Sequence, residues 1–283
     1  MRSLISLVVL AIGSTAASAA DMPVKAAPMA PVYHSPFFGY ISGAVLRNTS
    51  EDTFVTTGIV PGNSGNGYSG KAYIGYRFAN SFDIALGFGG TKLRDRSQTT
   101  GLVEHSQNSR LWTFDAELGY RLPFGGGHWV RPFAGIRYAN WRVEEGFITA
   151  GGGGGSPGSA TIENKGWGPR IGLDGKLRVP SLPVALVGGV SASWISGTLN
   201  ESGAFGGGFP PPVQSISRRM TNFEANIGIA YEPIKDFAVT LGYQWDSWKD
   251  VTLLNWTGPA GGPGSGTANR STHGPFLRLS YNY

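Results

Sequence analysis

The residues of this 283-residue chain that could do chemistry are charged side chains placed at alternate positions of otherwise apolar segments. Nine are basic and seven are acidic. In each segment the charged residues occupy one set of alternate positions and the apolar residues the other, and we call these two sets the two parities of the segment. Groups of both signs around one lumen can screen solutes as a charged constriction, or plug the lumen as a network of ion pairs. The small basic excess would favour anions slightly. The predicted lumen-lining residues are Lys71, Arg77, Asp83, Asp115, Glu117, Arg121, Arg131, Arg137, Arg170, Asp174, Lys176, Arg178, Glu224, Glu232, Asp246 and Arg278.

Other kinds of site find little support in the sequence. A hydrolytic site needs a histidine with an orienting carboxylate, and only His105 and His273 of the four histidines fall in expected outer loops. The chain has no cysteine, no acidic loop of calcium-binding spacing, and no lysine in the glycine run at 151–155. Its net charge is +5, but the basic residues are scattered. We therefore expect no enzymatic activity, no metal or other cofactor, and no nucleic-acid partner.

Alternation with a period of two predicts that β-strands position these charges. Between Trp112 and Leu122, apolar side chains at even positions alternate with polar or charged ones at odd positions. Alternation alone fits both a soluble sandwich and a membrane barrel, because each has one apolar face and one polar face. Ten strands are predicted, at 37–47, 68–78, 82–93, 109–122, 129–142, 165–179, 183–197, 219–232, 236–248 and 274–283.

The lengths of the connections separate these two folds. Short turns alternate with loops of roughly 15 to 25 residues, and compact soluble domains rarely carry several such loops. Short periplasmic turns and long outer loops are typical of transmembrane barrels. The turns are predicted at 79–81, 123–128, 180–182 and 233–235, and the principal loops at 48–67, 143–164, 198–218 and 250–273.

Tryptophan and tyrosine on the apolar parity gather toward the ends of the predicted strands. Both residue types favour the interfaces of a bilayer, so the pattern predicts two aromatic girdles. Glycine recurs on the charged parity, for example at Gly75, Gly119 and Gly172, where it would relieve crowding in a curled sheet. The predicted outer girdle is Trp112, Tyr138, Trp167, Trp194 and Trp245, and the inner one is Tyr76, Tyr120, Tyr231, Tyr281 and Tyr283.

The N-terminal residues predict export. Residues 1–20 combine Arg2, an apolar stretch at 4–12 and the small residues Ala17-Ser18-Ala19, which is the pattern of a cleaved signal peptide. The apolar stretch is much shorter than the roughly 20 residues that a spanning helix needs. Residues 21–36 are rich in proline and alanine without a period, so we expect an extended periplasmic tether there. The barrel is then expected at 37–283.

Several stretches resemble a known family. Glu117 to Leu122, Val130 to Ala139, Trp167 to Asp174 and the ending Gly274 to Tyr283 resemble pore-forming outer-membrane proteins typified by the Legionella major outer membrane protein. The leader and tether are similar to those of small alphaproteobacterial porin-like proteins. The resemblance implies an outer-membrane barrel that forms a pore and supplies no catalytic residues. Such barrels usually end in phenylalanine, and this chain ends in tyrosine.

The sequence as a whole predicts an all-β fold, a closed antiparallel transmembrane barrel of about ten strands, with eight or twelve as the alternatives. Only 14% of the residues are charged, against about 25% in soluble domains. We expect a porin-like protein of the outer membrane with a narrow charged lumen for small hydrophilic solutes, because barrels of this size have little free interior. The alternatives are a closed structural or surface-interaction barrel and, more remotely, a barrel enzyme. Expected partners are outer-membrane lipid, lipopolysaccharide and, through the C-terminal strand, the barrel-insertion machinery.

Overall fold

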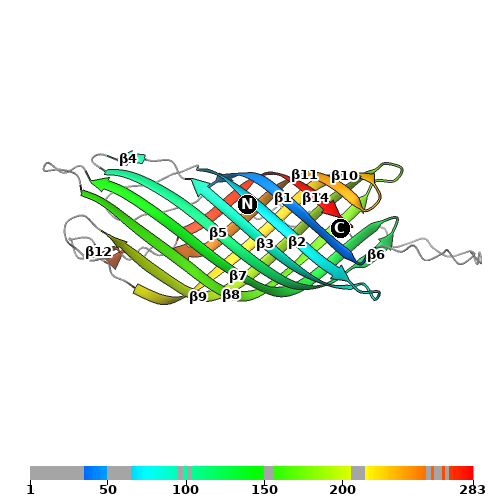
Figure 1. The fold of residues 1–283 in the computed structure, drawn as a ribbon, viewed down its shortest axis with the longest axis horizontal. Helices are drawn as coiled ribbons and strands as arrows, with labels where there is room; N and C mark the ends of the chain where they lie inside the picture. The colour runs from blue at the N-terminus through cyan, green and yellow to red at the C-terminus, as the bar shows by residue number, and fades with distance from the viewer. Residues whose placement is uncertain are drawn as a thin grey trace, which may run out of the picture. The chain divides into compact units, whose positions relative to one another are not determined.

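The chain folds into a closed antiparallel barrel (Figure 1). The computed structural model describes residues 35–49, 65–94, 98–100, 103–149, 156–204, 214–252, 256–257, 263–264 and 268–282, and every regular element in them is a strand. The main sheet runs in the order β4-β5-β3-β2-β1-β14-β11-β10-β9-β8-β7-β6, and the pairing of β5 with β7 closes it. Since β4 and β6 have only three and four residues, ten long strands form the wall, as the sequence predicts.

The ten wall strands range from 12 to 23 residues. β6 (Leu122–Gly125) continues β5 beyond Arg121, β4 (Gln98–Thr100) pairs with β5, and β12 (Trp256–Thr257) pairs with β13 (Pro263–Gly264) in a separate sheet. The wall strands are β1 (Phe37–Asn48), β2 (Asn66–Arg77), β3 (Phe82–Arg94), β5 (Val103–Tyr120), β7 (His128–Thr149), β8 (Ser156–Arg178), β9 (Val184–Ala204), β10 (Gln214–Ile234), β11 (Phe237–Thr252) and β14 (Ala268–Tyr281).

No helix in the described part of the chain is long and apolar enough to cross a membrane.

Short turns occupy one end of the barrel, which we call the turn end, and the long connections occupy the other, the loop end. Three of the turns place a non-glycine residue at positive φ, Ser81 at 69°, Ser181 at 65° and Asp236 at 67°. Serine and aspartate suit such positions because their short polar side chains can bond to the nearby backbone. The predicted turn at 123–128 is wrong in extent, because β6 continues the ladder through Pro123 and leaves only Gly126 and Gly127 as the turn.

The wall strands extend further toward the loop end than the sequence predicts. The predicted loop at 143–164 is largely strand, since β7 continues to Thr149 and β8 begins at Ser156. The predicted loop at 198–218 is likewise shortened by β9 and β10. A membrane needs only about 9–11 residues of a tilted strand, so the 23 residues of β8 are about twice that length. The sequence does not predict these extensions, because the outward residues of the strands, such as Arg142, become polar there while the strands stay paired.

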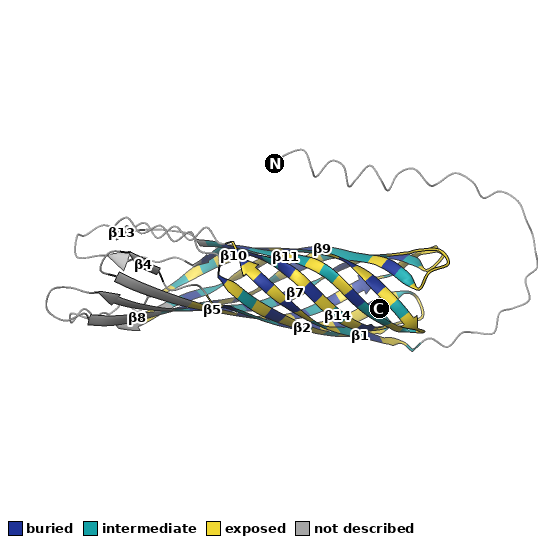
Figure 2. Cartoon of the chain, turned by 90° about the horizontal axis from the view of Figure 1, so that it is seen from above, coloured by how far each residue is buried: buried dark blue, intermediate teal, exposed yellow. Residues whose placement is uncertain are grey.

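Through most of its length the barrel has an apolar exterior and a polar interior. Leu118 and Ile41 are 55% and 60% exposed, whereas Asp83 and Arg131 are 0% and 1% exposed. Figure 2 shows the resulting alternation of buried and exposed positions along the coloured parts of the wall strands. A soluble sandwich would bury the apolar parity instead, so this burial pattern is that of a barrel whose outer face contacts lipid.

The pattern reverses toward the loop end. There the inward positions carry apolar side chains, while the outward positions carry residues such as Arg110 and Arg142. Outside a bilayer the exterior of a barrel meets water, so an apolar interior and a charged exterior become favourable, as in a soluble protein. The inward residues form one cluster, which we call the apolar layer: Ala44, Leu46, Leu93, Leu111, Ala139, Trp141, Val143, Ile162, Ile195, Leu199, Met220, Trp248, Val251 and Phe276.

Candidate lumen site

Arg131, on β7, is the centre of the first group of interior ion pairs. Its Nε lies 3.0 Å from both carboxylate oxygens of Asp83, and its Nη2 lies 2.6 Å from Oδ1 of the same residue. Its Nη1 donates to Glu117 at 3.3 Å and to Asp174 at 3.1 Å. One guanidinium therefore holds carboxylates from strands β3, β5 and β8. Charge-assisted bonds of this kind are stronger than hydrogen bonds between neutral groups.

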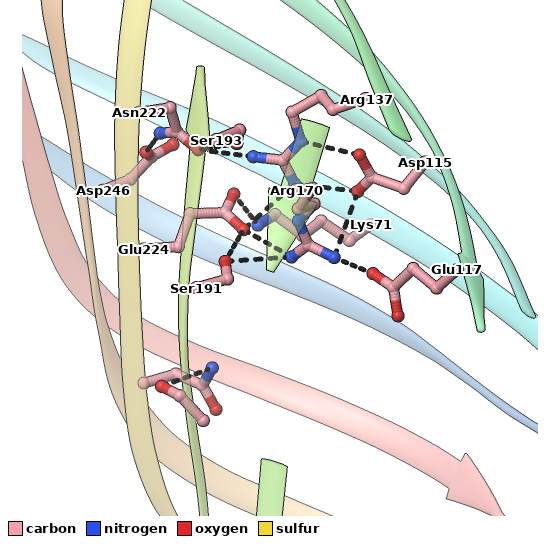
Figure 3. A network of polar contacts seen from close by, with 12 residues as sticks. Lys71, Asp115, Glu117, Arg137, Arg170, Ser191, Ser193, Asn222, Glu224 and Asp246 are labelled. Carbon is pink, nitrogen blue, oxygen red and sulfur yellow. Dashed lines mark hydrogen bonds and ion pairs between the residues drawn. The ribbon is translucent and has the colours of Figure 1, made fainter. Parts of the chain in front are cut away.

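Glu224, on β10, is the centre of the second group (Figure 3). Its Oε2 accepts bonds from Arg137 at 3.1 Å, Arg170 at 2.9 Å and the Ser191 hydroxyl at 3.2 Å. Its Oε1 accepts a bond from Lys71 Nζ at 2.7 Å. Three cations from three strands thus converge on one carboxylate, and this convergence crosses the lumen from β2 to β10.

Arg137 joins the second group to the wall on both sides. It binds Asp115 through Nε at 2.6 Å and Nη2 at 2.8 Å, in the paired geometry that guanidinium and carboxylate favour. Its Nη1 donates to Asn222 at 2.5 Å, and Asn222 in turn donates to Asp246 at 2.6 Å. The chain of contacts therefore runs from β5 through β7 and β10 to β11.

Glu117 connects the two groups. It pairs with Arg131 and with Arg170, and it accepts a bond from the Tyr73 hydroxyl at 2.5 Å. Together the two groups form one continuous network. We call it the ionic layer, and it consists of Lys71, Asp83, Asp115, Glu117, Arg131, Arg137, Arg170, Asp174 and Glu224.

Inward glycines make room for these large side chains. A Cβ at Gly119 would overlap the guanidinium of Arg131, and a Cβ at Gly172 would overlap the Phe133 ring. The guanidinium of Arg131 lies 5.2 Å from the centre of that ring. The recurrence of glycine on the charged parity therefore reflects space for interior side chains at these positions, in addition to any role in curling the sheet.

Aromatic rings hold other predicted lumen cations. The guanidinium of Arg77 lies 4.7 Å from the centre of the Phe38 ring, and that of Arg278 lies 4.4 Å from the Tyr40 ring. Stacking of this kind keeps a cation against the wall. Near the turn end, Arg121 lies over Trp129 in the same way, and Lys176 and Arg178 both pair with Glu232.

The sixteen predicted lumen residues thus all lie on the inward parity, and nine of them meet in the ionic layer. Arg178 is the least enclosed, with a 47% exposed side chain at the end of β8. Whether these residues line a path for solutes stays a prediction. Four neutral residues on the inward parity also take part in the interior hydrogen bonds, although the sequence does not predict them: Tyr73, Ser191, Ser193 and Asn222.

The predicted girdle residues face outward where the structure describes them. Trp112, Trp167, Trp194 and Trp245 are exposed, and the half-buried Tyr138 packs against Trp167 with ring centres 4.8 Å apart. Of the predicted inner-girdle tyrosines, Tyr76, Tyr120, Tyr231 and Tyr281 are exposed. The fifth, Tyr283, lies outside the described residues.

A small polar cavity of about 60 Å³ lies in the interior beside the ionic layer. Its lining includes Lys71, Asp115, Glu224, Asp246 and Arg278. A space of this volume holds a few water molecules. It is far smaller than the aqueous channels of large porins, in line with the limited interior of a barrel of ten strands.

The two histidines considered as a catalytic pair lie on separate strands. His105 belongs to β5 and His273 to β14, and β3, β2 and β1 lie between these strands in the sheet order. His273 faces outward and contacts the Tyr243 hydroxyl. Among the described residues, no group of three or more histidine and acidic side chains could hold a metal ion.

Comparisons with known proteins identify the barrel. A family model described as the Legionella pneumophila major outer membrane protein precursor matches residues 44–283. The outer membrane protease OmpT from Escherichia coli is similar with a TM-score of 0.50 and 13% identity, over 87% of this chain and 95% of that chain. A major outer membrane protein from Thermus thermophilus is similar with a TM-score of 0.38 and 13% identity, over 88% of this chain and 99% of that chain. At 13% identity the OmpT structure shows the fold alone. No curated protein matches the sequence.

Proposed function

Because the chain belongs to the outer-membrane barrel family of the Legionella pneumophila major outer membrane protein, we propose that it is an outer-membrane barrel whose lumen is closed at rest. Its turn end then faces the periplasm and its loop end faces the exterior, as in other barrels of this class. In this role the barrel strengthens the envelope and presents its extended loop end at the cell surface.

The observation that carries this proposal is the burial of the interior side chains. Trp141 and Trp248 of the apolar layer, and Arg131 and Arg137 of the ionic layer, are each only 1% exposed. A side chain that lines a water-filled channel is in contact with that water, so its exposed fraction would be substantial. Water therefore does not reach these four side chains, and the partly exposed inward side chains, such as Lys71 at 31%, lie beside the polar cavity.

A narrow porin-like pathway for small hydrophilic solutes, as the sequence predicts, is the second candidate. The polar cavity favours it, because Lys71, Asp246 and Arg278 are there placed around a space that can hold water. For solutes to pass, the apolar layer would have to open above that cavity, since Trp141 and Trp248 pack with ring centres 5.8 Å apart. Both candidates place the barrel in the outer membrane and differ only in the state of the lumen.

Liposome swelling distinguishes the two candidates. The purified barrel is reconstituted into liposomes, a general porin serves as the positive control, and the liposomes are diluted into sugars of graded size. A closed barrel predicts no swelling above that of protein-free liposomes, even with the smallest sugar. Swelling that falls with sugar size would overturn the closed barrel and support the porin-like pathway.

A further inference from the structure

The outer wall carries a row of basic side chains that crosses neighbouring strands. Tyr68 on β2 is the direct cross-strand partner of Lys92 on β3, and Lys92 is the partner of Arg110 on β5. Arg110 is in turn the partner of Arg142 on β7. All four residues lie on the outward parity. We call them the basic row.

This arrangement is unfavourable by itself. Like charges directly opposite each other on adjacent strands destabilise a sheet, and the row contains two such pairs, Lys92 with Arg110 and Arg110 with Arg142. Arg142 is neutralised by Glu144, at 3.0 Å, and also faces Glu163, its cross-strand partner on β8. Within the described residues, no acidic side chain forms an ion pair with Lys92 or Arg110. The row therefore has an unmet requirement for negative charge.

The basic row lies directly above the apolar band of the wall. Arg110 is two residues from Trp112, which corresponds to about 7 Å along a strand. Trp112 stacks on Phe88 with ring centres 5.4 Å apart, and Phe114 continues the apolar face toward the turn end. Tryptophan marks the boundary between acyl chains and headgroups. Arg110 is thus at the height of the lipid headgroups, and its cross-strand partners Lys92 and Arg142 lie on the neighbouring strands, about 5 Å to either side.

In the strands that the structure describes, no other two outward cations without an ion pair are direct cross-strand partners. Arg47, Arg219 and Lys249 are exposed singly, opposite the uncharged residues Asn66, Ser196 and Thr221. At the same height, Lys165 on β8 is already paired with Glu163, at 3.3 Å. On β9 the outward residues above Trp194 are Ser196 and Thr198, which carry no charge. The uncompensated cations of the row are thus concentrated on β3 and β5, next to the exposed hydroxyl-bearing side chain of Tyr68.

We propose that the basic row binds the phosphate groups of the anionic glycolipid in the outer leaflet. Lysine and arginine provide charge-assisted donors to phosphate oxygens, Tyr68 adds a neutral donor, and the stacked aromatic rings below contact the acyl chains. Bound phosphate supplies the negative charge that Lys92 and Arg110 lack. This inference rests on the outer-membrane location alone, so it holds whether the lumen is open or closed.

The test compares Lys92→Gln/Arg110→Gln with the matched control Lys165→Gln, which removes a compensated cation at the same height. Each refolded barrel is titrated with purified lipopolysaccharide in a zwitterionic detergent. We expect the double variant to bind about thirty-fold more weakly than the unaltered protein, because two basic side chains at an anionic lipid surface are lost. We expect the control to bind within about two-fold, and equal binding by all three proteins would overturn the proposal.

Thermal unfolding separates ligand binding from a structural role of the row. Without lipopolysaccharide, the double variant should unfold at the same temperature as the unaltered barrel or higher, because the repulsion is relieved. Added lipopolysaccharide should raise the unfolding temperature of the unaltered barrel much more than that of the double variant. A double variant that is less stable without ligand would contradict the account. Inorganic phosphate that protects as well as lipopolysaccharide would also overturn the assignment to a glycolipid.

Discussion

Replacing Arg131 by methionine should be among the most damaging single changes in the barrel. The guanidinium neutralises Asp83, Glu117 and Asp174, and the side chains of the first two are at most 1% exposed. Methionine fills most of the space but removes the cation that the three carboxylates share, although Glu117 keeps its pair with Arg170. Removing one partner of a buried ion pair costs about 3–5 kcal/mol of unfolding free energy. We expect Arg131→Met to lose at least that much, since three carboxylates share the one guanidinium.

The assay is urea unfolding of the reconstituted barrel, followed by tryptophan fluorescence. Arg142→Met is the control, because its side chain is 51% exposed and its ion pair with Glu144 should contribute only about 0–1 kcal/mol. Adding Asp83→Asn and Glu117→Gln to Arg131→Met should restore part of the loss, because the interior charges are then removed together. A loss below about 1 kcal/mol for Arg131→Met, or no recovery in the combined variant, would refute the reasoning.

Three further changes probe the two layers by the same unfolding assay. Gly119→Ala should cost about 1–3 kcal/mol, because the new methyl group would overlap the Arg131 guanidinium; unchanged stability would show that the guanidinium can move aside. Trp141→Ala and Trp248→Ala should each cost about 3–5 kcal/mol through the cavity left in the apolar layer, whereas a lipid-facing position would show no such cavity penalty. Glu224→Gln should cost about 3–5 kcal/mol because three cations lose their shared carboxylate, and a neutral result would exclude a structural role for this group.

The strand count and the closed topology could be predicted from the sequence because they depend on local signals. Alternation identifies strands, and the order of short and long connections indicates which strand ends face the periplasm and which face the exterior. In β5, the exposed residues Trp112 and Leu118 and the buried residues Asp115 and Glu117 lie where the alternation predicts. Parity is a property of the backbone, so a correctly placed strand assigns the direction of all its side chains at once.

The apolar layer could not be predicted in the same way. Alternation alone predicts that apolar residues face lipid along the whole strand, which holds only within the bilayer. Beyond it the outward face meets water, and inward residues such as Trp141 and Val143 become the apolar set. The change is visible in the sequence of β7 as a shift of the apolar residues from even to odd positions after Tyr138. That shift is the signal that would locate the point where a strand leaves the bilayer.

The ion-pair partners also lay beyond sequence reasoning. The pairing of Lys71 with Glu224 joins residues 153 positions apart across the lumen. Such contacts depend on the diameter of the barrel and on the stagger of its strands, and neither follows from the alternation. The balance of charge was predictable, whereas the choice between a constriction and a plug depends on whether the side chains reach one another. In this barrel they do, and that contact supports the proposed closed lumen.

The closed lumen can be tested most directly by the reactivity of single cysteines, because the chain has none of its own. Ser193 lies inside the lumen with 0% exposure, and Ser196 lies outward and exposed on the same strand, β9. In the reconstituted barrel, a charged thiol reagent applied to both sides should modify Ser196→Cys quickly and leave Ser193→Cys unmodified. Modification of Ser193→Cys at a rate close to that of Ser196→Cys would mean that water fills the lumen, and would contradict the closed barrel.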